Sequence, residues 1–401
     1  MRADRSIKTF LLKVTARCNL DCIYCYEYKL ADGSWRGKPA TMSMEILARS
    51  AARIREHVAA HRTKSVLVIF HGGEPLLAGV EFFEMALHKL REELSGLCSV
   101  RFGLQTNATL LSEEYVSLFR KYEVRVGISI DGDQEANDRF RRDHRGRSSF
   151  DATVRGLELI TREENKPIRG GLLSVIDPDA NPIATLDWLL KWSPPQIDFL
   201  LPHFNHVRRP TRAFDPRTGY GYGIWLCELF DYWWGHDLHT TKIRFFEDIM
   251  HLLLGGKYSV EALGLSPVEL LVIQSDGSYE AVDSIKSTVE GAVSTGLSVL
   301  EHAVDRAMDV HLVASRMDRA SNLASECECC ELVHVCGGGY IPHRWHQERR
   351  FLAPSVYCQD LQVIIRRIAE ALVAADSELA PLISRQLVPL RASAAAGHLH
   401  V

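Results

Sequence analysis

The sequence predicts an α/β protein: a parallel sheet over residues 7–202, followed by a smaller region that is rich in cysteine. Apolar runs suited to buried strands alternate with helical patterns in the first part, and this alternation stops after Pro202. Six strand–helix units of about 30 residues imply right-handed crossovers and parallel pairing. An open six-stranded barrel, an eight-stranded barrel that lacks units and a doubly wound sheet all fit, and periodicity alone does not choose between them.

Each expected strand is a short apolar run, and the segments between strands show helical periodicity. The strands are expected at residues 10–14, 66–70, 100–104, 124–130, 171–175 and 197–201. The helices are expected at residues 44–60, 80–94, 112–121, 150–163 and 182–192. Ser43 and Ser112 are candidate N-caps, because each precedes a helical pattern with an acidic residue in its first turn.

Beyond Pro202 the expected elements are shorter and less regular. They are a loop over 203–222, helices over 224–234, 245–254 and 361–375, and a hairpin over 270–280 that turns at Asp276-Gly277. Residues 325–360 show little regular structure. The chain therefore divides into a barrel over 1–215, bridging helices and the hairpin over 216–300, a cysteine-rich domain over 301–375 and a C-terminal tail over 376–401 that we expect to be mobile.

The composition argues against several classes of partner. The 401-residue chain has 47 basic and 51 acidic side chains and a net charge of −4, which gives no electrostatic reason to expect nucleic acid or an anionic membrane. No apolar run approaches the ~20 residues of a membrane span, and the first residues lack the apolar core of a signal peptide. We therefore expect a cytoplasmic protein, in which ten cysteines favour metal or redox chemistry over disulfides.

The cysteines gather near the two ends of the chain. Cys18, Cys22 and Cys25 follow the first expected strand, at the end of a barrel where active sites lie. Three thiolates on one short loop can hold three irons of a 4Fe–4S cluster and leave the fourth iron open to a substrate, whereas a structural zinc site would need a fourth ligand. The competing interpretation is a zinc-binding or redox loop in an unrelated α/β protein.

Motifs at successive expected strand ends support the iron–sulfur interpretation. The cysteine spacing, with an aromatic residue before the last cysteine, resembles the signature of the radical S-adenosylmethionine (SAM) superfamily. The segment 71–75 (HGGEP) resembles that family's GGE motif, whose glycines would let the backbone approach a ligand, and residues 105–107 and 129–132 resemble further SAM-contacting strand ends. The resemblance implies a partial (β/α)6 barrel.

The same resemblance implies which residues contact SAM. They are Tyr24, Gly72, Gly73, Glu74, Gln105, Asn107, Ser129 and Arg141. Glu74 would bind the amino group of the methionine part, and Arg141 would pair with its carboxylate. Arg139 and Arg142 are close rivals of Arg141 for that role.

The second group, Cys327, Cys330, Cys336 and Cys358, offers four thiolates, which suffice to close a 4Fe–4S cluster completely. A structural zinc site would use the same residues and is the competing interpretation. The pattern resembles the SPASM domain of anaerobic sulfatase-maturating enzymes and peptide-modifying radical SAM enzymes. That domain usually carries seven cysteines and two auxiliary clusters.

The sequence departs from the SPASM pattern at the inner of the two auxiliary clusters. Tyr340 and Val282 occupy two of its cysteine positions, and no cysteine lies between residues 228 and 326. We therefore expect two clusters in all: the three-cysteine cluster and one auxiliary 4Fe–4S cluster. Cys329, an extra thiol inside the motif, is expected to be a bystander.

Further C-terminal motifs resemble FxsB-like radical SAM/SPASM proteins, among them 279–286 (YEAVDSIK), 336–340 (CGGGY) and 354–358 (PSVYC). The resemblance implies that a 5′-deoxyadenosyl radical abstracts hydrogen from a ribosomally made precursor peptide and that a side-chain carbon–carbon crosslink, a cyclophane, then forms. The implied partners are that peptide, with leader and core, and an electron donor such as flavodoxin or ferredoxin. Formylglycine formation, epimerisation, a thioether or ether crosslink and a non-catalytic peptide-binding scaffold remain alternatives.

Asp283 directly follows the vacated cysteine position at Val282. In sulfatase-maturating enzymes the residue after that cysteine is a catalytic aspartate, so the resemblance implies that Asp283 is the proton acceptor. A structural carboxylate that caps the following helix at Ser284 is an equal alternative. His203 and His206 follow the last barrel strand, where substrate would enter, so they could contact it. The more common interpretation of residues at such a position is that they belong to a solvated loop.

Overall fold

The computed structural model describes residues 5–210, 221–236, 238–257 and 261–391. Within these residues, ten strands form one sheet in the order β10-β9-β8-β1-β2-β3-β4-β5-β6-β7. The strands are β1 (Thr9–Thr15), β2 (Ser65–Gly72), β3 (Ser99–Thr106), β4 (Arg125–Ser129), β5 (Arg169–Val175), β6 (Gln196–Leu200), β7 (Lys242–Ile243), β8 (Leu270–Ile273), β9 (Ser278–Glu280) and β10 (Ser294–Ser298). All pairs from β8 through β1 to β7 are parallel.

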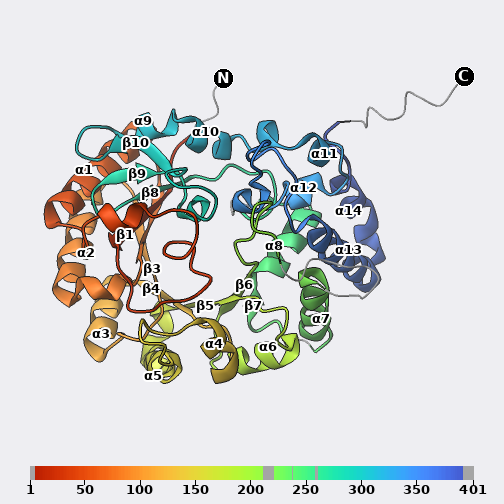
Figure 1. Ribbon diagram of the computed structural model, residues 1–401, viewed down its shortest axis with the longest axis horizontal. Helices are drawn as coiled ribbons and strands as arrows, with labels where there is room; N and C mark the ends of the chain where they lie inside the picture. The colour runs from red at the N-terminus through yellow and green to blue at the C-terminus, as the bar shows by residue number, and fades with distance from the viewer. Residues whose placement is uncertain (1–4, 211–220, 237, 258–260, 392–401) are drawn as a thin grey trace, which may run out of the picture.

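The strands β1 to β6 and the helices between them form an open barrel, with the helices on its outer side (Figure 1). These helices are α1 (Met44–His61), α2 (Val80–Leu94), α3 (Glu113–Tyr122), α4 (Gln134–Phe140), α5 (Phe150–Thr161) and α6 (Pro182–Leu190). Ser43 and Ser112 accept hydrogen bonds from the backbone N–H of Ile46 and Tyr115, so both predicted N-caps are present. The predicted partial barrel is confirmed, with the short helix α4 as an addition.

Both edges of the barrel are extended by strands from the second half of the chain. β8 pairs in parallel with β1, with Leu12 opposite Ile273, and forms an antiparallel hairpin with β9. Two-residue β7 pairs with β6 at the other edge. Because an edge strand presents unpaired N–H and C=O groups, β8 and β7 satisfy groups that a six-stranded sheet would leave free. The predicted hairpin is therefore part of the barrel sheet as well as a bridge to the cysteine-rich region.

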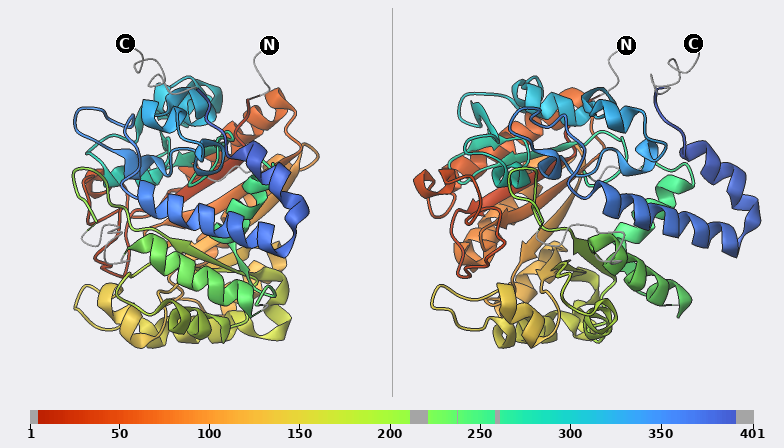
Figure 2. Two further views of the ribbon diagram at one scale, coloured as in Figure 1. Left: turned by 90° about the vertical axis from the view of Figure 1, so that its right-hand side faces the viewer. Right: turned by 45° about the vertical axis from the view of Figure 1, so that its right-hand side comes forward.

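The cysteine-rich region is built from short helices and one long one. Its helices are α9 (Val304–Met308), α10 (His311–Met317), α11 (Ser325–Glu328), α12 (Val333–Cys336) and α13 (Cys358–Ala375). The long helix α13 packs against α7 (Tyr222–Gly235) and α8 (Arg244–Leu253), and the three lie side by side in both views of Figure 2. This packing is close, because a Cβ at Gly223 would lie 2.7 Å from the Cα atom of Asp360.

The expectation of a mobile tail after residue 375 is wrong for residues 377–386, which form regular structure. Residues 377–379 form a turn of 3-10 helix, and α14 (Ala380–Gln386) packs against α8. Ile383 is only 3% exposed, so apolar burial fixes this segment. Residues 392–401 of the tail and residues 211–220 of the expected loop lie outside the described residues.

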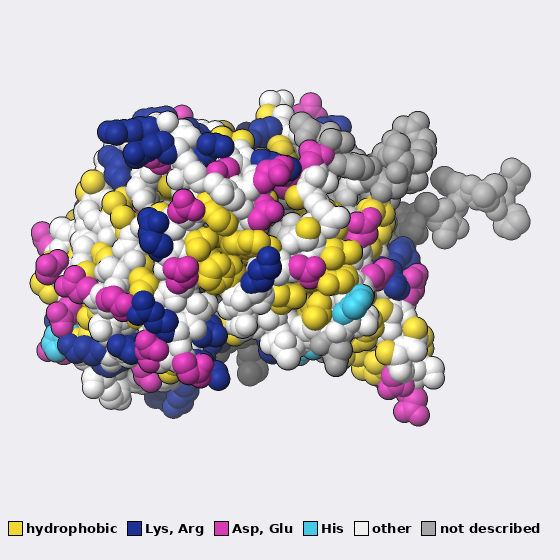
Figure 3. Space-filling view, turned by 90° about the horizontal axis from the view of Figure 1, so that it is seen from below, with side chains coloured by type: hydrophobic (Ala, Val, Ile, Leu, Met, Phe, Trp, Pro, Cys, Tyr) yellow, Lys and Arg dark blue, Asp and Glu magenta, His cyan; other side chains and the backbone are white. Residues whose placement is uncertain are grey.

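The surface bears charges of both signs. Figure 3 shows basic and acidic side chains interspersed over the lower face of the molecule, as the nearly balanced composition predicts. None of the helices in the described part of the chain is both long and apolar enough to cross a membrane.

Candidate active site

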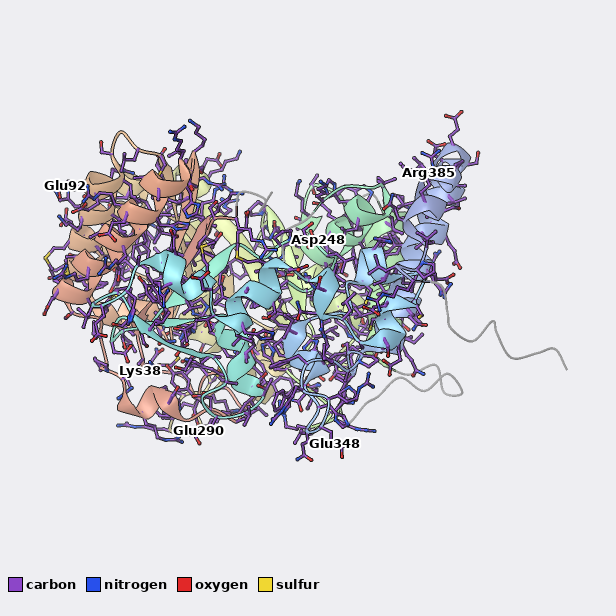
Figure 4. All side chains as sticks on the ribbon, turned by 90° about the horizontal axis from the view of Figure 1, so that it is seen from above. Lys38, Glu92, Asp248, Glu290, Glu348 and Arg385 are labelled. Carbon is purple, nitrogen blue, oxygen red and sulfur yellow. The ribbon has the colours of Figure 1, made fainter. Side chains whose placement is uncertain are left out.

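The first three cysteines lie on the loop that follows β1, at the carboxyl end of the sheet. This loop, the segment after the hairpin and the cysteine-rich region all reach one side of the molecule, where Lys38, Glu290 and Glu348 lie in Figure 4. Hydrogen bonds from Gly73 to Thr15, from Glu74 to Arg17 and from Asn107 to Asn19 join the loop to the ends of β2 and β3. A site at the carboxyl ends of parallel strands is the usual position in barrel enzymes.

The thiols of Cys18, Cys22 and Cys25 are free of disulfides and largely buried around the sulfurs. Burial raises the pKa of all three, to about 12 for Cys25, and the nearby thiolate of Cys22 raises those of Cys18 and Cys25 further. Grouped thiols of this kind lose their protons when a shared cationic centre neutralises the resulting thiolates. The donor set therefore fits three irons of a 4Fe–4S cluster.

The two glycines of the GGE segment lie against the backbone that leads into the cysteine loop. The N–H of Gly73 donates to the carbonyl of Thr15 at 3.1 Å, and the N–H of Glu74 donates to the carbonyl of Arg17 at 2.9 Å. A Cβ at Gly72 would lie 2.3 Å from the Thr15 oxygen, and one at Gly73 would lie 2.3 Å from the Arg17 oxygen. Glycine is needed here for the approach of two protein backbones. The approach of this backbone to a ligand stays a prediction.

Gly73→Ala is accordingly expected to destabilise the protein by about 1–3 kcal/mol and to weaken the binding of SAM, the ligand that the sequence resemblance implies. The added Cβ would meet the fixed Arg17 carbonyl and push the cysteine loop away from β2. Gly37→Ala is the matched control, because a Cβ there has no atom within 4 Å. Urea denaturation and equilibrium dialysis of SAM measure the two effects, and equal behaviour of the two variants would contradict the prediction.

Glu74 is fully buried and links the ends of β2 and β3. Its carboxylate accepts hydrogen bonds from Thr106 Oγ1 at 2.7 Å, from the Asn107 N–H at 2.9 Å and from the Leu76 N–H at 3.0 Å. Burial raises the pKa of this carboxyl, and these donors oppose the rise. A carboxylate has about four acceptor positions, so the fourth is available to an ammonium donor.

The polar residues at the ends of β3 and β4 lie beside Glu74 and the cysteine loop. Gln105 Nε2 donates to Ser129 Oγ at 2.8 Å. Asn107 Nδ2 donates to Asn19 Oδ1 at 2.9 Å and lies 3.9 Å from the sulfur of Cys18. The structure therefore pairs Gln105 with Ser129 and places Asn107 in contact with the cysteine loop itself.

Arg141 is the one of the three candidate arginines that is buried at this site. Its Nη1 donates to Tyr24 Oη at 2.8 Å, and Tyr24 donates to Asp131 Oδ2 at 2.6 Å. The Nε atom of Arg141 is buried with no partner among the described residues. Arg139 pairs with Glu135 and Asp177, and Arg142 donates to backbone carbonyls at the surface. The geometry therefore favours Arg141 as the residue that can receive an anionic group.

Asp283 begins the 3-10 helix η4 (Asp283–Ser287) and is 6% exposed. Its carboxylate lies 2.6 Å from Lys13 Nζ and accepts a hydrogen bond from Tyr26 Oη at 2.6 Å. Burial alone would raise its pKa, but the charge of Lys13 and the protein donors bring the pKa well below its usual range. The N-cap of η4 is Val282, and that helix has no side-chain cap hydrogen bond. Asp283 is therefore a buried, ionised carboxylate. It lies beside Tyr26, the residue that follows Cys25.

The partners of Asp283 belong to a buried ion network that the sequence reasoning missed. Lys13 also pairs with Glu27 at 3.0 Å, Glu27 pairs with Lys286 at 2.7 Å, and Lys286 pairs with Glu280 at 3.2 Å. The network joins β1, the cysteine loop, η4 and the hairpin. A sequence signal existed, because Lys13 is the single charged residue within an apolar strand.

Two neutral histidines lie near Asp283. Burial lowers the pKa of His71 to about 4, and the Lys13 charge contributes to this shift. Burial also lowers the pKa of His203 to about 4, and its ring lies 5.0 Å from that of Tyr26. His203 Nδ1 is buried and has no partner in the described part of the chain. His203 is therefore part of the site interior, in contrast to the solvated loop that is common after a strand.

Cys327, Cys330, Cys336 and Cys358 line one cavity of about 150 Å³, together with Gly338, Ser355 and Gln362 among others. Burial raises the pKa of Cys327 to about 11 and that of Cys336 to about 12, and the neighbouring cysteines add to both shifts. Four converging thiols fit a fully ligated cluster. Cys329 is exposed and does not line this cavity.

The positions that would serve an inner auxiliary cluster are filled by protein packing. Val282 packs in an apolar cluster with Ile285, Val293 and Ile341. The hydroxyl of Tyr340 donates to Ser284 Oγ. No group of thiols other than the two already described was identified in the described residues.

Comparison with known proteins agrees with this geometry. Residues 12–181 match the family model of the radical SAM superfamily. A cysteine-type anaerobic sulfatase-maturating enzyme of Clostridium novyi is 25% identical over 345 residues, which cover 84% of this chain and 88% of the relative. A serine-type anaerobic sulfatase-maturating enzyme of Bacteroides thetaiotaomicron is 24% identical over 345 residues, which cover 81% and 80%.

Solved structures share the fold. Native anSMEcpe with bound AdoMet superposes with a TM-score of 0.77 at 22% identity, over 92% of this chain and 99% of that chain. The same protein with AdoMet and the Cp18Cys peptide gives the same score. Streptococcus suis SuiB bound to the precursor peptide SuiA gives a TM-score of 0.59 at 15% identity, over 88% and 76% of the two chains.

Proposed function

We propose that this chain, which carries a radical SAM domain over residues 12–181, is an enzyme that modifies a peptide by radical chemistry. One observation carries the proposal: the three-cysteine loop, the buried Glu74 and the buried Arg141 meet at the carboxyl ends of the barrel strands. The sulfatase-maturating relatives and the peptide-bound structural neighbours support a peptide or protein substrate. We place the enzyme in the cytoplasm, with flavodoxin or ferredoxin as electron donor.

The proposed cofactors of the barrel are a 4Fe–4S cluster on Cys18, Cys22 and Cys25 and a SAM molecule on its open iron. When bound, they supply a 5′-deoxyadenosyl radical that takes hydrogen from an unactivated side-chain carbon. The protein holds and orients the cofactor: the open acceptor position of Glu74 suits the amino group, and Arg141 suits the carboxylate. Asn107 fixes the loop that carries Cys18.

The second proposed cluster is a single auxiliary 4Fe–4S cluster on Cys327, Cys330, Cys336 and Cys358. Anaerobically reconstituted protein is therefore expected to bind about eight irons and eight sulfides per chain, four of each for every cube. Cys358→Ala should reduce both to about four, whereas Cys329→Ala, which removes the exposed neighbouring thiol, should leave both unchanged. Iron and acid-labile sulfide assays measure the counts. Zinc in either site, or a third cluster, would contradict the assignment.

The proposed product is a side-chain carbon–carbon crosslink of the cyclophane type in a ribosomally made precursor peptide. The C-terminal motifs that resemble FxsB-like proteins support this chemistry. After the substrate radical attacks an aromatic ring, loss of one electron and one proton would restore aromaticity, and the auxiliary cluster on Cys327, Cys330, Cys336 and Cys358 would accept that electron. Asp283 is the proposed acceptor of that proton, since it is ionised and lies at the site.

Formylglycine formation on a sulfatase is the second candidate. It is favoured by the maturating enzymes of C. novyi and B. thetaiotaomicron, which match over four fifths of both chains. Two kinds of substrate can be tested. The first is any short peptide encoded beside the gene for this chain, and the second is the Cp18Cys peptide that is bound in the anSMEcpe structure. Reduced, SAM-loaded enzyme should convert an aromatic-rich encoded peptide to a product that lacks two hydrogens and resists fragmentation between the joined residues. A product that instead reacts with an aminooxy reagent carries an aldehyde and indicates formylglycine.

A further inference from the structure

We propose that Gln362 raises the reduction potential of the auxiliary cluster on Cys327, Cys330, Cys336 and Cys358, called the outer cluster below. Gln362 would do so by donating a hydrogen bond to one of the cysteine sulfurs, and this inference rests on the proposed four-cysteine cluster. The Nε2 atom of Gln362 lies 3.4 Å from the sulfur of Cys358 and donates to it. Gln362 also lines the cavity into which all four thiols converge. Its amide is therefore placed to act on the cluster that the four thiols would hold.

The position of Gln362 follows from the helix that carries the last cysteine. Cys358 is the first residue of α13, and Gln362 follows four residues later, so the two side chains lie on the same face. The rest of that turn is anchored, because Asp360 accepts a hydrogen bond from the N–H of Gly223 at 2.7 Å. The donor is thus held by a packed helix rather than by a loop.

A donor to a ligand sulfur changes the potential through charge. Reduction adds one negative charge to the cluster, and part of it resides on the thiolate sulfurs. A partial positive charge on an amide N–H stabilises the reduced state more than the oxidised state, which raises the potential. Hydrogen bonds to sulfur are among the recognised determinants of iron–sulfur potentials.

Other groups around the cavity act in the same direction. The Cys336 sulfur is hydrogen bonded by the backbone N–H of Gly338. The buried guanidinium of Arg344 interacts with the charges of Cys327 and Cys336 and is held by the carbonyl of Phe351 at 2.8 Å. Among the described residues, the one carboxylate that lines the cavity, Glu326, is paired with Arg349. The donors and the buried cation therefore favour the reduced cluster, which suits it to receive an electron from the modified substrate.

The experiment isolates the outer cluster in the full-length chain. Replacing Cys18, Cys22 and Cys25 together by alanine removes the first site and leaves the four outer thiols. In this background Gln362→Leu removes the donor, and Gln362→Glu replaces it with a negative charge. Gln359→Leu is the matched control. It makes the same change of side chain, but Gln359, one residue after Cys358, is exposed. A redox titration followed by electron paramagnetic resonance measures the midpoint potential of each variant.

We expect the potential to shift in the negative direction in Gln362→Leu, further in Gln362→Glu, and not at all in Gln359→Leu. If Gln362→Leu fails to bind a cluster, the midpoint potential of the Gln362→Glu variant tests the tuning role in its place. Unchanged potentials in both Gln362 variants would overturn the tuning role and leave the proposed function intact. A triple-alanine background that binds zinc or no cluster would overturn the outer cluster itself, and the tuning role with it.

Discussion

Lys13→Met is expected to lower the free energy of unfolding by about 3–5 kcal/mol, the usual cost of removing one partner of a buried ion pair. The Lys13 side chain is 1% exposed, and its ammonium lies 2.6 Å from Asp283 and 3.0 Å from Glu27. Glu27 keeps Lys286 as a second partner, so the charge left without a cation is that of Asp283. Urea denaturation followed by circular dichroism, on proteins prepared alike, measures the difference.

The pH range of this effect follows from the direction of the two pKa shifts. The pKa of Asp283 is lowered on folding, so its contribution is present above the unfolded value of about 3.9 and is lost as the pH falls through the folded pKa. The pKa of Lys13 is raised, because Asp283 and Glu27 outweigh the opposing effect of burial; its contribution is present below about 10.4 and is lost at still higher pH. The penalty of Lys13→Met should therefore be constant between about pH 5 and pH 9.

Two further variants test the origin of this penalty. Lys8→Met removes an exposed pair with Glu269 just before the same strand and should cost less than about 1 kcal/mol. The double variant Lys13→Met with Asp283→Asn should recover part of the loss, because it leaves no unpaired charge in that pair. A Lys13→Met protein as stable as Lys8→Met would show that the pair adds nothing to stability.

The barrel could be predicted from sequence because its signals are local. Each barrel strand contains a short apolar run, and each long helix shows its period within a few residues; Ser43 and Ser112 also mark two helix starts. The predicted strand and helix positions of the barrel agree with the structure to within about two residues at most ends. The short helix α4 lacked an apolar period long enough to be recognised, although Asp133 caps it.

Pairings between distant segments could not be predicted in the same way. The residues of β8 predict a strand, but nothing local states that Leu271 will lie beside Phe10. The contact of α14 with α8 likewise depends on a surface formed by other helices. Such contacts depend on side-chain complementarity across 100 or more residues, and no period in the sequence encodes them.

The residues of the candidate site also fall into those with a local sequence signal and those that depend on contacts between distant segments. The spacing of Cys18, Cys22 and Cys25 indicates a shared centre from eight consecutive residues. The partner of Asp283 comes from β1, 270 residues earlier in the chain, and only the parallel pairing of β1 with β8 brings the two together. A lone lysine in a buried strand is the signal that sequence reasoning could have used, because a buried charge requires a partner.

Asp283→Asn is expected to reduce formation of the modified peptide by about 10²–10⁴-fold, the range for loss of a general base, and to leave release of 5′-deoxyadenosine intact. Asparagine keeps the shape and can still accept a hydrogen bond from Tyr26, but it cannot accept a proton. The lowered pKa of Asp283 makes it a weak base. A weak base suffices, because the proton released when a ring-bound radical loses an electron is strongly acidic.

Asp276→Asn provides the matched control, since Asp276 lies at the turn of the β8–β9 hairpin that precedes Asp283 and pairs with Lys38 in a more exposed position. That variant should retain both activities. Product formation by mass spectrometry and 5′-deoxyadenosine by chromatography, measured in one reaction, separate the roles of Asp283. If Asp283→Asn loses both in proportion, Asp283 acts by holding Tyr26 and the cysteine loop in place. The proton-transfer role requires that hydrogen abstraction continues while the modified peptide fails to appear, because only the later step consumes a base.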